Sequence, residues 1–184
     1  MTDPKVLIIG PLPPPIGGQS ILVHDIYKGL QESNKPVVVF NIAHEIHYSI
    51  QRLFTSIRWM FLFAISLWRD KPSIIHIHSS AGVPLLEKLL FACIARVAGK
   101  KTILHMHGGK MATLWSGYPS LLQSLFRALI NKLCSRLIVL SDSWRGFYID
   151  QVGISIPIDI LPNGVRVPTE VQEKEDCETI KIIF

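Results

Sequence analysis

Short apolar segments alternate with longer amphipathic segments along most of this chain. Six segments rich in valine, isoleucine and leucine are predicted to be β-strands: residues 6–10, 37–42, 74–78, 102–106, 137–140 and 158–161. Their apolar character is almost continuous, which is typical of parallel strands that are covered on both faces. The alternation therefore predicts an α/β fold with a doubly wound parallel sheet, for which we expect the strand order 3-2-1-4-5.

The segments between these strands have helical periodicity. Helices are predicted over residues 20–30, 85–98, 120–134 and 142–149. Gly99 follows the second of them, in the position of a helix stop signal. Ser141 precedes the last and is a suitable N-cap.

Residues 53–68 form the most hydrophobic segment and contain Trp59, Phe61, Phe63 and Trp68. The segment is too short for a bilayer span, which needs about 20 apolar residues, and it includes Arg58. One interpretation is a crossover helix buried against the sheet. The other is a helix that dips into an anionic membrane surface with help from nearby basic residues. The sequence leaves both interpretations open.

The character of the chain changes after residue 164. Residues 1–168 are predicted to form one domain, and the polar, mostly acidic residues 169–179 a linker. Residues 180–184 have the pattern of a first strand of a further, truncated domain. We therefore expect this chain alone to be catalytically incomplete.

Composition narrows the class of protein without choosing a function. The 184 residues are 48% hydrophobic and 18% charged, which is typical of a globular protein. The net charge of +5 favours anionic partners, but the basic residues are dispersed and argue against nucleic-acid binding. Three unpatterned cysteines and an N-terminus without signal-peptide features predict a cytoplasmic protein, with peripheral contact at the inner membrane face as a further expectation.

A glycine-containing loop follows the first predicted strand. Gly17 and Gly18 precede a predicted helix, whose free N–H groups are suited to phosphate. The loop lacks the lysine of a P-loop and the G-x-G-x-x-G spacing of dinucleotide sites. An ordinary turn that needs two glycines explains the pattern equally well.

Strands three and four end in alternating histidine pairs, His76 with His78 and His105 with His107. Each pair shares a face of its strand. In the expected strand order these strands are not neighbours, so we expect no metal site. His107 stands apart because Gly108 and Gly109 follow it. A neutral histidine there could hydrogen-bond a sugar hydroxyl or stabilise developing charge, or simply end the strand.

The order of several motifs resembles the N-terminal domain of glycosyltransferase family 4, whose members have the GT-B fold. The motifs are the Gly17-Gly18 loop, the segment 71–78 beginning Lys71-Pro72-Ser73, the segment 105–109, the segment 137–141, and the turn 161–165. The family often has aspartate where this chain has Ser73. The similarity covers almost the whole chain.

The resemblance implies a Rossmann-like acceptor-side domain of a retaining, hexosyltransferase-type enzyme that uses a nucleotide-sugar. The acceptor would be a glycan or a lipid-linked acceptor, and no cofactor or metal is expected. Gly17 and Gly18 would face the donor diphosphate, and His107 would contact the transferred sugar near the reacting centre. Substrate binding is expected of Gly108, Gly109, Ser141 and Asn163.

Two other functions remain possible on the sequence. A nucleotide-binding oxidoreductase is disfavoured by the glycine spacing and by Asn41 and His44, which stand where a ribose-binding carboxylate is usual. A truncated binding module without turnover is the non-enzymatic alternative.

Overall fold

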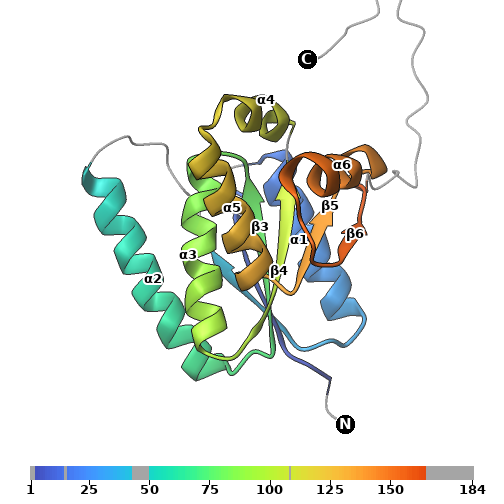
Figure 1. Ribbon diagram of the computed structural model, residues 1–184. Coiled ribbons are helices and arrows are strands. Elements are labelled where there is room, and N and C mark those ends of the chain that lie inside the picture. The colour runs from blue at the N-terminus through green and yellow to red at the C-terminus, as the bar shows by residue number, and fades with distance from the viewer. Residues whose placement is uncertain (1–2, 15, 43–49, 108, 165–184) are drawn as a thin grey trace, which may run out of the picture.

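The computed structural model describes residues 3–14, 16–42, 50–107 and 109–164, with no side-chain description for residues 50–53. These ranges form a parallel six-stranded sheet covered by helices (Figure 1). The elements in chain order are β1 (Val6–Gly10), α1 (Gly18–Glu32), β2 (Val37–Asn41), α2 (Ile50–Asp70), β3 (Ile74–Ser80), α3 (Val83–Val97), β4 (Lys101–His107), α4 (Lys110–Gly117), α5 (Ser120–Leu133), β5 (Arg136–Val139), α6 (Asp142–Phe147), η1 (Tyr148–Val152) and β6 (Ile158–Ile160).

The structure confirms the predicted α/β class and corrects the predicted strand order. The observed order is β2-β1-β3-β4-β5-β6, and every adjacent pair is parallel. β3 therefore lies between β1 and β4, where we expected β1 and β4 to be neighbours. The periodicity of a strand identifies its burial but not its neighbours, so the sequence pattern could not choose between the two common doubly wound orders.

The helices divide unequally between the two faces of the sheet. α1 lies behind the sheet in Figure 1, whereas α3, α5 and α6 lie in front of it and α2 lies beside α3. The main hydrophobic core fills the front face. Leu7, Ile9, Ile75, Ile77 and Leu104 point into this core from the three central strands and are almost completely buried.

α1 packs closely on the opposite face because Gly10 has no side chain. A Cβ at Gly10 would stand 2.8 Å from Cγ2 of Val23 in α1 and 3.3 Å from Cβ of His78 in β3. Contacts below 3.0 Å require neighbouring atoms to move. Gly10 is thus needed for packing, and Val23 of α1 is completely buried.

The structure confirms the predicted helices and adds one that the sequence did not predict. The helices predicted from residues 20–30, 85–98 and 120–134 appear as α1, α3 and α5, each with slightly shifted ends. α4 was missed, since its eight residues follow directly after two glycines in the sequence and carry little periodic signal. The predicted linker and final strand, residues 169–184, lie outside the described residues.

Candidate functional site

The topological switch point of the sheet lies between β1 and β3. The connection after β1 leads to α1 behind the sheet, while the connection after β3 leads to α3 in front of it (Figure 1). Where two adjacent parallel strands send their connections to opposite faces, their carboxyl ends leave room for a ligand. The loop containing Gly17 and Gly18 begins at this position, as the sequence predicted, although the neighbouring strand is β3 and not β4.

Gly17 is the N-cap of α1, and Gly18 is its first residue. The Ser20 hydroxyl accepts a hydrogen bond from the Gly17 N–H at 2.9 Å and lies 3.0 Å from the Gly17 carbonyl oxygen, to which it donates. The first N–H groups of a helix have no partner within the helix, and they carry its positive dipole end. The start of α1 is therefore a suitable position for a phosphate group.

The fold itself does not require glycine at these two positions. Both residues are exposed, and the φ of Gly17 is −159°, an extended value that any residue adopts. A Cβ at Gly18 would meet no described heavy atom within 4 Å, and one at Gly17 would meet only the Ser20 hydroxyl at 3.9 Å. Gly10 is different, because packing demands it. Without side chains, the two residues leave the backbone at the start of α1 open to close approach.

Asn41 fixes the loop between β1 and α1. Its side-chain oxygen accepts a hydrogen bond from the Leu12 N–H at 3.0 Å. Asn41 ends β2, where a dinucleotide-binding enzyme usually has a ribose-binding carboxylate. Asn41 therefore has a structural role in this loop, and the absence of a carboxylate at its position gives the oxidoreductase alternative no support.

Four histidines meet on the face of the sheet that α1 covers. Strand register places His78 opposite His105 and Ser80 opposite His107 on the adjacent strands β3 and β4. His76 and His105 have parallel rings with centroids 5.5 Å apart, and the rings of His105 and His107 are 4.2 Å apart. All four side chains are buried, His78 and His105 completely.

Hydrogen bonding within this cluster is uneven. His78 Nδ1 and His107 Nε2 lie 2.8 Å apart, and the tautomers decide which ring donates. His76 Nε2, His78 Nε2 and both ring nitrogens of His105 have no hydrogen-bond partner among the described residues. A buried polar atom without a partner costs about 1–3 kcal/mol of stability. The unpartnered nitrogens of the cluster therefore destabilise the fold.

Burial also keeps the four imidazoles neutral. It lowers the pKa of His76 and of His107 to about 4, and that of His105 to about 2. The pKa of His78 lies well below its ordinary value for the same reason, with a further contribution from the neighbouring rings. Neutral imidazoles keep one lone pair each, so the cluster can accept hydrogen bonds or ligate a cation.

The reason given in the sequence analysis for excluding a metal site is wrong. It assumed that β1 and β2 separate the two histidine strands, whereas β3 and β4 pair directly over seven residues. Ring nitrogens of His76, His78 and His105 all lie within 4.8 Å of one another. The spacing of the histidines along each strand was read correctly, and the error was in the neighbour assigned to β3.

The remaining predicted site residues are spread along the carboxyl edge of the sheet. Gly109 is the N-cap of α4, and Gly108 lies outside the described residues. Ser141 caps α6, where its hydroxyl accepts a hydrogen bond from the Trp144 N–H at 3.4 Å. Asn163 is exposed beyond β6. The N-cap at Ser141 confirms that part of the sequence prediction, and the substrate-binding roles of these residues stay predictions.

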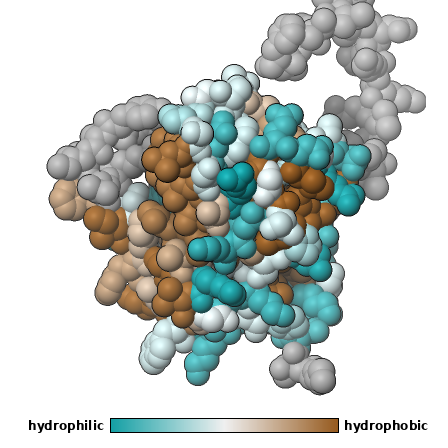
Figure 2. All heavy atoms as spheres, in the orientation of Figure 1, coloured by the Kyte–Doolittle hydropathy of each residue, from teal (hydrophilic) through white to brown (hydrophobic). Residues whose placement is uncertain are grey.

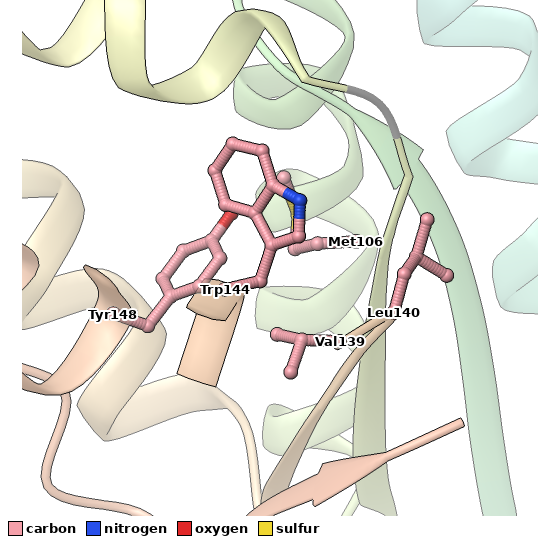
Figure 3. Close-up of a pocket in the computed structure, with 5 residues that line it drawn as sticks. All are labelled: Met106, Val139, Leu140, Trp144 and Tyr148. Atoms are coloured by element: carbon pink, nitrogen blue, oxygen red, sulfur yellow. The ribbon is translucent and has the colours of Figure 1, made fainter. Parts of the chain in front are cut away.

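Sequence reasoning missed a small pocket near the carboxyl ends of β4 and β5. Figure 3 shows the Trp144 ring facing Met106, with Tyr148 beside it, and Val139 and Leu140 also line the pocket. A Cβ at Gly109 would stand 3.9 Å from the Trp144 ring, so this pocket is close to the start of α4. The sequence feature that could have indicated this pocket is Trp144, which closely follows the N-cap Ser141.

α2 has a buried face and an exposed apolar face. Phe63 and Leu67 are buried in the core, so the crossover-helix interpretation holds for this side of the helix. An exposed apolar stripe runs along the other side, and its members are Phe54, Ile57, Phe61, Ile65 and Trp68. Figure 2 shows hydrophobic surface gathered over α2 and α3. Within the described part of the chain, every helix is too short or too polar to cross a bilayer.

Comparison with known families agrees with this architecture. The sequence model of Glycosyltransferase Family 4 matches residues 16–167, which include the α1 N-terminus and the histidine cluster. The chain belongs to glycosyltransferase family 4. The predicted family is thereby confirmed. A search of proteins with curated functions gives no match to this chain.

Solved structures support the fold of this family 4 domain. The S. aureus MnaA–UDP co-structure aligns with a TM-score of 0.59 and 11% identity over 87% of this chain and 43% of its own. UDP-GlcNAc 2-epimerase from Methanocaldococcus jannaschii aligns with a TM-score of 0.50 and 13% identity over 83% of this chain and 45% of its own. The family 4 chain thus spans less than half the length of each of these structures.

Proposed function

We propose that this family 4 chain is the acceptor-side domain of a retaining glycosyltransferase that moves a hexose from a nucleotide-sugar to a glycan or lipid-linked acceptor. The family match over residues 16–167 carries the proposal. The start of α1 supports it, because two glycines that packing does not require stand beside free helix N–H groups. In this proposal Gly17 and Gly18 face the donor diphosphate.

His107 is the proposed contact to the transferred sugar. It ends β4, and its Nε2 is occupied by His78, so a sugar hydroxyl would meet Nδ1. If His78 donates from Nδ1, the neutral His107 carries its proton on Nδ1 and can donate to a sugar oxygen. The lowered pKa of about 4 keeps His107 neutral near pH 7, which suits hydrogen bonding better than proton transfer.

The acceptor would bind along the carboxyl edge of the sheet. Gly109, Ser141 and Asn163, together with Gly108, are the polar candidates for this role. Trp144 adds an aromatic ring in the adjacent pocket, and such a ring can pack against a sugar face or a lipid chain (Figure 3).

The exposed stripe on α2 is the proposed contact with an anionic membrane. Phe61 and Trp68 are 67% and 80% exposed, and the basic side chains of Arg58 and Lys71 are also exposed. Asp70 and Glu87 are the acidic residues of α2 and α3; Asp70 pairs with Arg69 at 2.8 Å, and Glu87 is buried. Apolar insertion together with positive charge favours anionic lipid. Such a contact would bring a lipid-linked acceptor to the site.

Transfer by the full-length protein tests the proposed activity. Nucleotide-sugars labelled in the hexose would be offered with membrane lipid extract or oligosaccharide, and the anomeric configuration of any product would be read by NMR. We expect retention, and turnover reduced by at least about 100-fold in His107→Ala, in line with the loss of a group that acts at the reacting centre. His24→Ala is the matched control, since His24 lies on α1 outside the cluster. Absence of transfer with every nucleotide-sugar would contradict the proposal.

Liposome flotation tests the membrane contact separately. Trp68→Glu combined with Phe61→Glu should abolish flotation with anionic vesicles. Ile149→Glu is the control, because Ile149 is also an exposed apolar residue, 46% accessible, but lies on η1. Equal flotation of both variants, or no flotation of the unmodified protein, would remove α2 from the membrane contact and leave the transfer reaction untouched.

A further inference from the structure

The histidine cluster contains more nitrogen ligands than the proposed sugar contact uses. His107 alone is assigned to substrate, while His76, His78 and His105 are buried on paired strands, on the same face of the sheet as α1. Alternation along β3 puts His76 and His78 on one face, and strand register puts His105 directly opposite His78. Three imidazoles therefore converge from two rigid strands, which are better supports for a site than loops.

The free nitrogens of these three residues point to a missing partner. His76 Nε2, His78 Nε2 and both nitrogens of His105 are buried and make no hydrogen bond among the described residues. Buried polar groups in native proteins almost always have a partner, so each exception needs a physical reason. One cation that accepted a lone pair from each ring would give a partner to three of these four nitrogens.

We propose that His76, His78 and His105 form a binding site for one divalent transition-metal ion, with Zn²⁺ as the best match. Their ligand atoms lie within 4.8 Å of one another. In a tetrahedral site with Zn–N bonds of about 2.0–2.1 Å, the nitrogens stand about 3.4 Å apart. The rings must therefore close by up to about 1.4 Å, which side-chain rotation on fixed strands can supply.

The donor set selects the class of metal. Three neutral imidazoles suit Zn²⁺, Co²⁺, Ni²⁺ and Cu²⁺, whereas Mg²⁺ and Ca²⁺ need oxygen ligands. Three protein ligands leave one position for solvent in a four-coordinate zinc site. The ion would join β3 to β4 and would be taken up most easily during folding, because the three side chains are buried in the folded protein.

His107 has the place of an outer partner in this site. A metal-ligating histidine usually hydrogen-bonds its other ring nitrogen to a neighbouring group. His78 would use Nε2 for the metal and donate from Nδ1 to His107 Nε2 at 2.8 Å. The metal thereby fixes the His78 tautomer and leaves the proton of His107 on Nδ1. His107 is a positioning residue for the metal and at the same time the proposed sugar contact.

Metal binding by the full-length protein, stripped with a chelator, tests this site without any transfer assay. After refolding with ZnCl₂ and gel filtration, we expect one Zn²⁺ per chain, a raised Tm, and no Tm change with MgCl₂ or CaCl₂. CoCl₂ should produce the visible absorption bands of tetrahedral cobalt. His107→Ala should weaken zinc binding by about 10–100-fold, as removal of an outer partner does, and His105→Gln should weaken it further.

The matched control is His24→Gln, which removes a histidine of α1 and should keep both the zinc and the cobalt spectrum. Circular dichroism establishes that each variant is folded, and His105→Leu provides a second variant that avoids an unpaired amide. Failure of the unmodified protein to retain zinc would overturn the proposal. Zinc binding that survives in His105→Gln and His105→Leu would place the ion elsewhere and overturn it equally. Either result leaves the proposed glycosyl transfer standing.

Discussion

The two faces of the sheet are built from the same strands and have opposite chemistry. On the front face, Ile75, Ile77, Leu104 and Met106 of β3 and β4 point into a continuous hydrophobic core. On the back face, the alternate residues of the same strands include the four histidines. Successive side chains of a strand point to opposite faces, so one alternating sequence supplies both. Burial of apolar side chains on the front face stabilises the fold. Burial of histidine nitrogens without partners on the back face destabilises it, and it brings four imidazoles together.

Acid should distinguish the two faces most strongly. In the unfolded chain these histidines have pKa values near 6.5, whereas burial lowers the pKa of His76 and His107 to about 4 in the folded protein. The unfolded state therefore binds more protons below pH 6.5. Stability is full above this pH and is lost as the pH falls towards 4.

Each buried histidine whose pKa falls to about 4 then contributes a loss of about 1.4 kcal/mol per pH unit below pH 6.5, which is about 2 kcal/mol at pH 5. Urea unfolding in the presence of a chelator measures this slope. His105→Leu should reduce it by about one quarter, while His24→Gln should follow the unmodified protein. A free energy of unfolding that is flat between pH 7 and 5 would show that the histidines are not buried as described.

A truncation on the front face should lower the free energy of unfolding by the same amount at every pH. Ile77 is completely buried in the core, so Ile77→Ala is expected to lower the free energy of unfolding by about 2–5 kcal/mol. Val97→Ala on the exposed end of α3 is the control, with an expected change within about 0.5 kcal/mol. The Ile77→Ala loss should be equal at pH 7 and pH 5. A loss that depends on pH would mean that the faces are not independent.

The contrast also shows what the sequence could predict. Periodicity identified β3 and β4 and the alternation of His76, His78, His105 and His107, because these depend on neighbours in the chain. Strand order depends on contacts between distant segments, and the wrong order led to the wrong argument about a metal site. The Gly17-Gly18 loop was found because glycine before a helix is a local signal, whereas the Trp144 pocket required tertiary packing to be visible.

Gly10 lies on the back face beside Val23 and His78, and it offers a sharper test of that face. A Cβ at this position would stand 2.8 Å from Val23 Cγ2, so Gly10→Ala should cost about 1–3 kcal/mol by overpacking. In a Val23→Ala background the same change should cost much less, because the methyl group that clashes is gone. Equal costs in both backgrounds would show that α1 does not rest on Gly10.

Gly18→Ala should have the smallest effect on stability and a large effect on function. No described heavy atom lies within 4 Å of a Cβ there, and alanine favours the helix, so a gain of about 0.5 kcal/mol is expected. Gly29→Ala on the same helix is the matched control, since its Cβ also meets no described atom. Both variants should unfold at slightly higher urea concentration. Donor binding and transfer by the full-length protein should fall only in Gly18→Ala, because its methyl group would obstruct a phosphate at the helix start. Gly29 lies near the other end of α1, away from the proposed phosphate position. Equal transfer by the two variants would remove Gly18 from the donor site.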